Sequence, residues 1–265
     1  MIAAPPPLKS NQGWLSPPAR LQLEPGAVHV WRAPLSGAEI DCAAMEGCFS
    51  PQERRRARSF VVERARRQFS VTRWTLRTLL GEYLQIPPNQ VEFELSGKGK
   101  PGLGDTHGCS QINFNVSHSG DWALLAFQTG DPIGVDLECI RSSVEWLPLA
   151  ARYLELLPQQ LDCLARLPEP DGRREFFKLW TFHEALAKGL GCGIGGFGRG
   201  NCNLPPSGYV RAFNTPTGLV RPDGWRIVEL NLWPGYVGAV ATPGDFRTLE
   251  QWDLTAEGCS VFGKK

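Results

Sequence analysis

Two long helical patterns, each surrounded by short strand-like runs, constrain the fold of this chain more than any other feature. From about residue 50 to residue 84, apolar residues recur with a period near 3.6, which predicts an amphipathic helix. Ser50, Pro51 and Glu53 form a typical helix start, with a capping box between the serine and the glutamate. The helix should end before the two prolines at 87–88.

The second long helix is predicted over Arg173–Lys188, with Gly189 as the residue that ends it. Helical character begins earlier, from about Glu145. Strand-like runs fill much of the remaining chain and are separated by Gly-rich or polar turns. They are Val28–Trp31, Val91–Leu95, Ile112–Val116, Trp122–Phe127, Ile133–Glu138, Tyr209–Phe213, Trp225–Leu230 and Tyr236–Ala241.

The order of a strand, a long helix and several strands thus occurs twice, which predicts an α+β fold with two halves of similar size. The expected halves are residues 27–130 and 131–265, preceded by a loose, Pro-rich N-terminal arm at residues 1–26. A site at the junction of the halves would follow the preference of binding pockets for domain interfaces.

Composition and charge exclude several classes of function. A chain of 265 residues with 42% hydrophobic and 21% charged residues is ordinary for a globular protein. Its net charge of +1 gives no overall attraction to nucleic acid. No apolar run approaches the roughly 18 residues of a membrane span, and the N-terminal segment lacks the order of a signal peptide. Because the eight cysteines lack Cys-x-x-Cys spacing, we expect reduced thiols and a cytoplasmic protein.

Three carboxylates form the first candidate site. Asp136 and Glu138 are two residues apart on a predicted strand, so both side chains project from one face. Taken alone, such a pair is more typical of a solvated strand edge. Glu184 and Lys188 are four residues apart on the second long helix and share a face, as in an ordinary surface ion pair. Carboxylates that converge from a strand and a helix would nevertheless suit Mg²⁺, and a neighbouring lysine would neutralise a phosphate.

Other segments bear on phosphate binding, although each also has a commoner structural interpretation. The GKGKP turn at 97–101 places two lysines where backbone amides also face an anion. Ser117 and His118 end an apolar strand, and residues 53–58 carry an arginine run that is usually a solvated helix face. Residues 191–196 match G-x-G-x-x-G, but they follow a helix rather than a strand, which argues against a dinucleotide site.

Together these segments resemble the signature of the surfactin-synthetase-type 4′-phosphopantetheinyl transferases. FNVSHSG (114–120) is followed by IGVDLE (133–138) and then by LWTFHEALAK (179–188). The family pattern is roughly G-I/V-D-x-E followed by W-x-x-K-E-A/S-x-x-K. GKGKP, and SP-x-E-x-R near the first long helix, also occur at family-like positions. The matching order spans about residues 28–242, which is nearly the whole chain.

The resemblance implies a pseudo-twofold fold of two similar α/β halves, each a small sheet packed on a long helix, with coenzyme A bound between them. It implies transfer of 4′-phosphopantetheine from coenzyme A to a serine of an apo acyl or peptidyl carrier protein, with release of 3′,5′-ADP. The metal would be Mg²⁺, with Mn²⁺ as an alternative. The partner would be a carrier protein of fatty-acid, polyketide or nonribosomal-peptide synthesis, not nucleic acid or a membrane, and the chain would be a monomer.

The family motifs also imply roles for individual residues. Asp136, Glu138 and Glu184 would hold the metal on the pyrophosphate, and Glu184 and Lys188 would be catalytic. The contacts to coenzyme A would come from Arg56, Lys98, Lys100, Pro101, Asn115, Val116, Ser117, His118, Asp136 and Lys188. Within this set, His118 and Arg56 would hold the 3′-phosphate of the adenosine end.

Two positions depart from the family pattern. His183 stands where the family usually has a lysine, so this position would carry less positive charge near pH 7. Gln159 and Gln160 stand near the place of a glutamate proposed as the general base, and an amide cannot accept the proton. Glu155 or a metal-bound water would then serve. These departures leave open a second interpretation, a catalytically weak member that binds coenzyme A or a carrier protein.

The arginines support two further hypotheses. Arg173 and Arg174, beside the candidate catalytic residues, would dock a carrier protein, because carrier proteins are usually acidic. A nucleic-acid-binding role for the arginines of residues 53–77 is disfavoured by the near-neutral net charge and by the acidic cluster.

Overall fold

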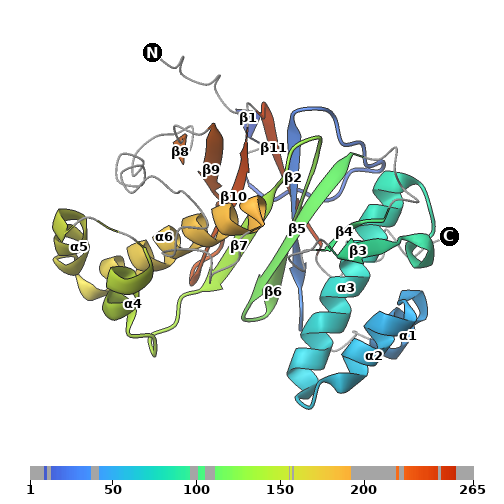
Figure 1. Ribbon diagram of the computed structural model, residues 1–265, viewed down its shortest axis with the longest axis horizontal. Coiled ribbons are helices and arrows are strands. Elements are labelled where there is room, and N and C mark those ends of the chain that lie inside the picture. The colour runs from blue at the N-terminus through green and yellow to red at the C-terminus, as the bar shows by residue number, and fades with distance from the viewer. Residues whose placement is uncertain are drawn as a thin grey trace.

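A computed structural model of the chain describes residues 9–10, 13–36, 42–95, 101–104, 111–154, 156, 158–191, 219–220, 224–243 and 246–254. Its main elements form four layers, in which two central sheets are each covered on the outside by a long helix (Figure 1). This arrangement confirms the predicted α+β fold with a small sheet on a long helix in each half.

The first sheet has five strands in the order β1-β11-β2-β6-β5. These strands are β1 (Lys9–Ser10), β2 (Ala27–Pro34), β5 (Ile112–Ser119), β6 (Trp122–Thr129) and β11 (Thr248–Asp253). β6 pairs with β2 and β5 in antiparallel fashion, whereas β11 runs parallel to both β1 and β2. The division of the chain at residue 131 stays a proposal, and β11, from near the C-terminus, lies in the sheet of the first half.

Helix α3 (Glu63–Leu84) covers the outer face of this sheet and buries Leu76, Leu79 and Leu80 against Trp31 and Phe127. Smaller elements complete this half. They are α1 (Cys42–Met45), η1 (Glu46–Cys48), α2 (Pro51–Ser59), η2 (Pro88–Gln90) and the hairpin of β3 (Phe93–Leu95) with β4 (Pro101–Leu103).

The predicted start of the first long helix is confirmed. The backbone amide of Glu53 donates to Ser50 Oγ at 3.2 Å, and the amide of Ser50 donates to Glu53 Oε2 at 2.8 Å. The prediction of one continuous helix to residue 84 is wrong, because Phe60 and Val62 have extended backbone that separates α2 from α3. Two successive valines, which are β-branched, favour such an extended break.

The second sheet has four antiparallel strands in the order β7-β10-β9-β8. They are β7 (Gly134–Cys139), β8 (Leu219–Val220), β9 (Trp225–Glu229) and β10 (Tyr236–Pro243). Its outer face is covered by α6 (Glu169–Leu190), which buries Phe182 and Leu186 against Trp225 and Ile227. Helices α4 (Trp146–Tyr153) and α5 (Pro158–Ala165) pack against the first part of α6.

The C-terminal end of α6 differs from the prediction. Gly189 lies inside the helix, and a Cβ at this position would lie 2.5 Å from the ring of Trp225, so the glycine serves close packing. The residue that ends the helix is Gly191, which has a left-handed backbone with φ of 70°. Both glycines fit an end signal in sequence, and only the packing of Trp225 distinguishes them.

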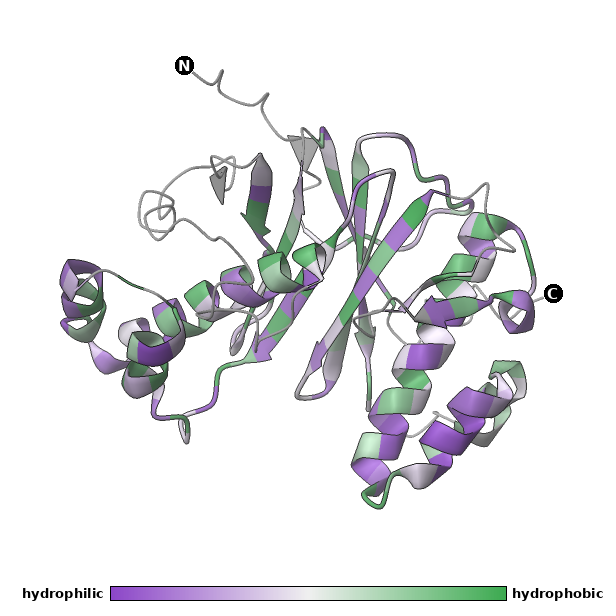
Figure 2. Cartoon of the chain, in the orientation of Figure 1, coloured by the Kyte–Doolittle hydropathy of each residue, from purple (hydrophilic) through white to green (hydrophobic). Residues whose placement is uncertain are grey.

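A shared apolar core joins the two sheets. The first sheet contributes Val28, Val30, Leu124 and Ala126, and the second contributes Val135, Leu137 and Val240. Helix α2, by contrast, is mostly hydrophilic along its length (Figure 2). Across the described residues, we find no helix with the length and apolar character needed to span a membrane.

The strands predicted at 28–31, 91–95, 112–116, 122–127, 133–138, 225–230 and 236–241 correspond to β2, β3, β5, β6, β7, β9 and β10. The strand predicted over Tyr209–Phe213 lies outside the described residues. The short strands β1, β4 and β8 were not predicted, and neither was β11.

Candidate active site

Strands β5 and β7 run side by side where the two sheets meet, and side chains rather than paired backbones connect them. Three amides of β7 each donate to a side chain of β5, at intervals of two residues. These bonds run from Val135 N to Asn115 Oδ1 (3.0 Å), from Leu137 N to Ser117 Oγ (3.3 Å) and from Cys139 N to Ser119 Oγ (3.0 Å). We call this set of contacts the β5–β7 ladder.

Asp136 lies at the centre of the junction and is only 4% exposed. Its Oδ1 accepts from Lys188 Nζ at 2.7 Å and from Ser117 Oγ at 2.9 Å, and Lys188 Nζ also lies 2.9 Å from Ser117 Oγ. The other carboxylate oxygen, Oδ2, is buried and has no hydrogen-bond partner. Burial raises the pKa of Asp136, although the Lys188 ammonium and the Ser117 hydroxyl oppose this rise.

Glu138 lies two residues further along β7 and is more exposed. Its Oε2 accepts from Ser119 Oγ at 2.9 Å, and Arg141 Nη2 lies 3.7 Å away. Burial and then the charge of Asp136 raise the pKa of Glu138. Sequence reasoning missed Ser119, although the alternation of Asn115, Ser117 and Ser119 along one strand was a visible signal.

Glu184 approaches these carboxylates from α6 and is 6% exposed. Burial, together with the negative charges of Asp136 and Glu138, raises its pKa to about 7, while Lys188 opposes the rise. Helix α6 comes this close because β7 begins with a glycine. A Cβ at Gly134 would lie 1.9 Å from the backbone oxygen of Ala185, so a larger residue would displace the helix.

The donor set at the junction fits a divalent cation in its chemistry. Asp136, Glu138 and Glu184 supply hard carboxylate oxygens, which Mg²⁺ prefers, and one of these oxygens is buried without a partner. Burial raises the pKa of each carboxyl, and neighbouring carboxylate charges add to the rise at Glu138 and Glu184, which a cation would offset. Among the described residues, no three His, Cys, Asp or Glu side chains already form a metal-binding cluster, and the cation nearest to Asp136 is the Lys188 ammonium.

The similarity to known proteins extends over both halves. The chain is 36% identical over 231 residues to 4′-phosphopantetheinyl transferase HetI of a Nostoc strain, covering 87% of this chain and 94% of the relative. The chain belongs to the 4′-phosphopantetheinyl transferase superfamily. The superfamily pattern matches residues 132–241, and the pattern of the 4′-phosphopantetheinyl transferase N-terminal domain matches residues 36–130. The predicted enzyme class, a phosphopantetheinyl transferase, is thereby confirmed.

Other relatives match this phosphopantetheinyl transferase over shorter regions. The 4′-phosphopantetheinyl transferase psf-1 of Bacillus pumilus is 37% identical over 129 residues, which cover 44% of this chain and 51% of the relative. The L-aminoadipate-semialdehyde dehydrogenase-phosphopantetheinyl transferase of Xenopus laevis is 29% identical over 158 residues, which cover 56% of this chain and 51% of the relative.

The transferase's candidate coenzyme A residues on β5 divide between two faces of the strand. Asn115 and Ser117 face β7 and belong to the ladder. Val116 packs against the core of the first half, on the opposite face. His118 is exposed at the end of the strand, and desolvation and the charge of Lys188 lower the pKa of its imidazole.

The remaining candidate phosphate contacts lie in the first half. Arg56 is exposed on α2, with its guanidinium carbon 5.6 Å from the ring centre of Phe69. Pro101 begins β4 and is half-buried. Lys98 and Lys100, in the GKGKP turn, lie outside the described residues.

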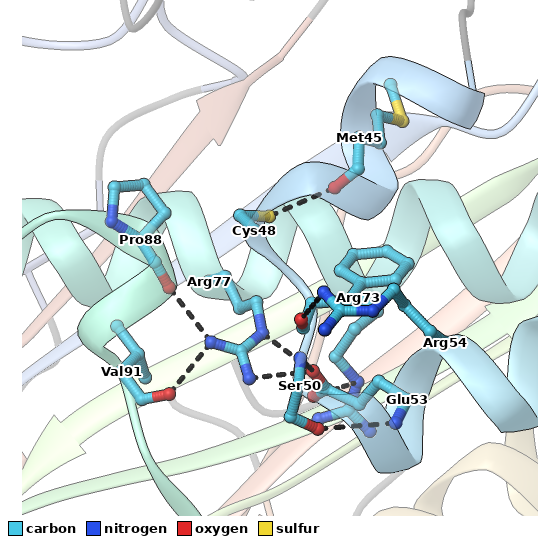
Figure 3. Close-up of polar contacts among 10 residues, drawn as sticks. Met45, Cys48, Ser50, Glu53, Arg54, Arg73, Arg77, Pro88 and Val91 are labelled. Carbon is cyan, nitrogen blue, oxygen red and sulfur yellow. Dashed lines mark hydrogen bonds and ion pairs between the residues drawn. The ribbon is translucent and has the colours of Figure 1, made fainter.

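Glu53 of the SP-x-E-x-R segment has a structural role (Figure 3). Besides capping α2, its Oε2 accepts from Arg77 Nε at 2.9 Å and from Arg77 Nη2 at 2.7 Å. Arg77 is 2% exposed, and its Nη1 also donates to Pro88 O at 2.9 Å and to Val91 O at 2.8 Å. This network fixes α2 on α3 and thereby holds Arg56 at the surface.

The two departures from the family pattern lie in different surroundings. His183 is buried within α6 at 4% exposure, so it is not an exposed cation at the phosphate. Gln159 and Gln160 belong to α5 and line a cavity of about 670 Å³ between α5 and α6. Glu155, the alternative base, lies outside the described residues.

The two arginines proposed to dock a carrier protein differ in their contacts. Arg173 Nη1 donates to Arg141 O at 2.7 Å and to Val144 O at 2.6 Å, and its guanidinium also pairs with Glu169. It thereby fastens the segment after β7 to α6. Arg174 is exposed, so it is the better candidate of the two for an electrostatic contact with a partner.

Proposed function

We propose that this transferase moves 4′-phosphopantetheine from coenzyme A to a serine of an apo acyl or peptidyl carrier protein, with the help of a divalent metal ion. One observation carries the proposal. At the junction of the two halves, the Lys188 ammonium bonds to Asp136. Two further carboxylates, Glu138 and Glu184, lie beside this pair, and their raised pKa values indicate that their negative charges are only partly compensated. Such a group of one lysine and three carboxylates suits a phosphoryl substrate with a bound cation.

Asp136, Glu138 and Glu184 are the proposed metal ligands. Mg²⁺, or Mn²⁺ in its place, would supply charge neutralisation on the pyrophosphate of coenzyme A. The three carboxylates would hold the cation and, through it, orient the pyrophosphate. The β5–β7 ladder would hold Asp136 and Glu138 in place.

Lys188 is the proposed contact to the phosphate under attack. Its side chain is 27% exposed, so a phosphate oxygen can approach the ammonium from the solvent side. In the reaction, the carrier serine oxygen forms a bond to phosphorus, and the bond from phosphorus to 3′,5′-ADP breaks. The ammonium then stabilises the charge that develops on the phosphate oxygens.

The serine must also lose a proton. Glu155, or a water on the cation, would accept this proton. Glu184 would not, since a carboxylate that holds the cation keeps little basicity.

His118 and Arg56 are the proposed contacts to the 3′-phosphate of coenzyme A. Both are exposed, whereas the side chains of Asn115 and Ser117 are already bonded to β7. Lys98, Lys100, Pro101 and Val116 would line the rest of the path by family match.

The biological setting follows from the same proposal. The partner would be a carrier protein rather than nucleic acid or a membrane, and the two halves form one junction within a single chain, so a monomer suffices. The thiols of Cys48, Cys139 and Cys163, which form no disulfide, favour a reducing, cytoplasmic compartment.

Intact-mass spectrometry of apo carrier proteins tests the proposal. Carriers of fatty-acid, polyketide and nonribosomal-peptide type are incubated with the chain, coenzyme A and Mg²⁺, with a parallel sample in EDTA. A phosphopantetheine adduct that forms only with metal supports the reaction and its metal dependence. Binding of coenzyme A without an adduct on any carrier would instead support the weakly catalytic, binding-only interpretation.

A further inference from the structure

In the β5–β7 ladder, the hydroxyls of Ser117 and Ser119 each make a second hydrogen bond. Ser117 Oγ accepts from Leu137 N and lies 2.9 Å from Asp136 Oδ1. Ser119 Oγ accepts from Cys139 N at 3.0 Å and donates to Glu138 Oε2 at 2.9 Å. In each case the hydroxyl binds the amide of one β7 residue and the carboxylate of the residue before it.

This geometry determines the direction of the hydroxyl proton. A serine hydroxyl has one proton to donate and two lone pairs that accept. Because the Cys139 amide occupies a lone pair of Ser119, the proton is left for the Glu138 carboxylate. The direction of the carboxylate is thus fixed by a strand of the other sheet.

We propose that Ser119 is a positioning residue that orients Glu138 toward the cation of the active site. The proposal rests on the proposed function, in which Glu138 is a metal ligand. Hydrogen-bond partners of metal ligands commonly contribute 10- to 100-fold to metal affinity.

Ser119 carries this role better than the neighbouring polar groups. Arg141 Nη2 lies 3.7 Å from Glu138, and its side chain is 59% exposed, so it restrains the carboxylate weakly. Ser117 also contacts Lys188, so its loss would disturb two groups together. A neutral hydroxyl has a further advantage, because it orients Glu138 without cancelling the negative charge that attracts a cation.

The test compares Ser119→Ala with Ser119→Thr, which retains the hydroxyl. Binding of Mn²⁺ to the metal-free chain is measured by electron paramagnetic resonance, and kcat and KM are measured separately with Mg²⁺. Ser119→Ala should raise the Kd for Mn²⁺ about 10-fold or more, while the KM for coenzyme A changes less than about twofold. Ser119→Thr should stay within about threefold of the wild type in Mn²⁺ affinity.

Asn113→Ala is the matched control, because Asn113 lies on the same face of β5. It bonds to Gln111 O and Gly130 O, both at 3.3 Å, at the opposite end of the strand from Glu138. This variant should keep wild-type Mn²⁺ affinity. If Ser119→Ala fails to fold, Ser119→Cys, which is close in size but a weaker donor, takes its place.

Each result decides between the proposals. A folded Ser119→Ala chain with wild-type Mn²⁺ affinity, or an equal loss in Ser119→Thr, would overturn the role of Ser119 alone. A wild-type chain that neither binds Mn²⁺ nor modifies a carrier protein would overturn the proposed function, and the role of Ser119 with it.

Discussion

Lys188 Nζ lies 2.7 Å from Asp136 Oδ1, so that helix α6 contributes an ammonium to a strand carboxylate that is 4% exposed. The two side chains differ in exposure, because that of the lysine is 27% exposed. Removal of the lysine would leave a buried carboxylate without its cation, whereas removal of the carboxylate would leave a lysine that water can still reach. Lys188 therefore supports both the fold of the junction and the proposed chemistry.

Lys188→Met should lower kcat for carrier modification about 10²-fold or more, since a cation at the reacting phosphate is lost. Initial rates from intact-mass spectrometry measure this effect. Lys178→Met is the matched control, because Lys178 also lies on α6 but pairs with Glu229 at 2.8 Å. A Lys188→Met chain as active as the Lys178→Met chain would contradict the role of Lys188.

Glu184→Gln should abolish carrier modification and stabilise the metal-free chain at high pH. The pKa of Glu184 is raised from 4.5 to about 7, so the folded state holds a proton that the unfolded state has lost. Stability from this group is therefore present below pH 4.5 and is lost as the pH rises through 7. The difference between these two pKa values corresponds to at most about 3 kcal/mol of unfolding free energy.

Calorimetry in EDTA at pH 5 and pH 8 measures the effect of Glu184→Gln. The variant should have the higher Tm at pH 8, and its advantage over the wild type should shrink at pH 5. Equal Tm values for the two chains at pH 8 would contradict a raised pKa of Glu184 in the folded chain. Asp171→Asn provides a control on the same helix, because Asp171 is exposed and lies outside the junction.

The carboxylates of the site were predictable because their spacing is local. Residues two apart on a strand and four apart on a helix share a face whatever the tertiary fold, so Asp136 could be paired with Glu138, and Glu184 with Lys188, in advance. Burial, and then the charges of neighbouring carboxylates, raise the pKa of Glu138 and Glu184, which is consistent with the approach of the two pairs. Local periodicity likewise predicted one long helix and one small sheet in each half.

The features that sequence reasoning missed depend on contacts between distant segments. The role of Ser119 requires the register between β5 and β7, which no local pattern encodes. The choice of Gly191 over Gly189 as the end of α6 depends on the ring of Trp225. Strand β11 gave little local signal, and its place next to β2 is set by pairing across almost the whole chain.

His29→Asn should make the unfolding free energy less dependent on pH. His29 is buried, its Nδ1 lies 2.8 Å from the Tyr83 hydroxyl, and burial lowers its pKa from 6.5 to about 4. The unfolded state therefore binds a proton that the folded state does not. Stability from this group is present above pH 6.5 and is lost as the pH falls through about 4.

Urea unfolding at pH 4.5 and pH 7.5 checks this prediction. The gap between the two pKa values corresponds to about 3 kcal/mol, so the wild type should lose up to this amount relative to His29→Asn at low pH. The asparagine keeps a polar side chain at this position but cannot be protonated, so only the wild type titrates. Parallel pH profiles for the two chains would refute the prediction.

Arg77→Met should lower the unfolding free energy by about 3–5 kcal/mol, because it leaves the Glu53 carboxylate and two backbone oxygens without their buried partner. Arg64→Met is the control. Arg64 pairs with Asp121 at 3.2 Å, but its side chain is 64% exposed. The loss of such a surface pair should cost less than about 1 kcal/mol.

Chemical denaturation compares the two arginine variants with the wild type. If Arg77→Met were no less stable than Arg64→Met, the network around Glu53 would contribute no more than an exposed ion pair. If Arg77→Met instead lost stability as expected, carrier modification at low temperature would show whether α2 must be fixed for Arg56 to act.

The position of β11 has a consequence for how the protein is made. Arg32 of β2 is bound to Asp253 of β11, 221 residues later in the chain. A nascent chain therefore leaves this edge of β2 unpaired until residues 248–253 have been made. A fragment that ends at residue 130 would leave the same edge unpaired, because it lacks β11.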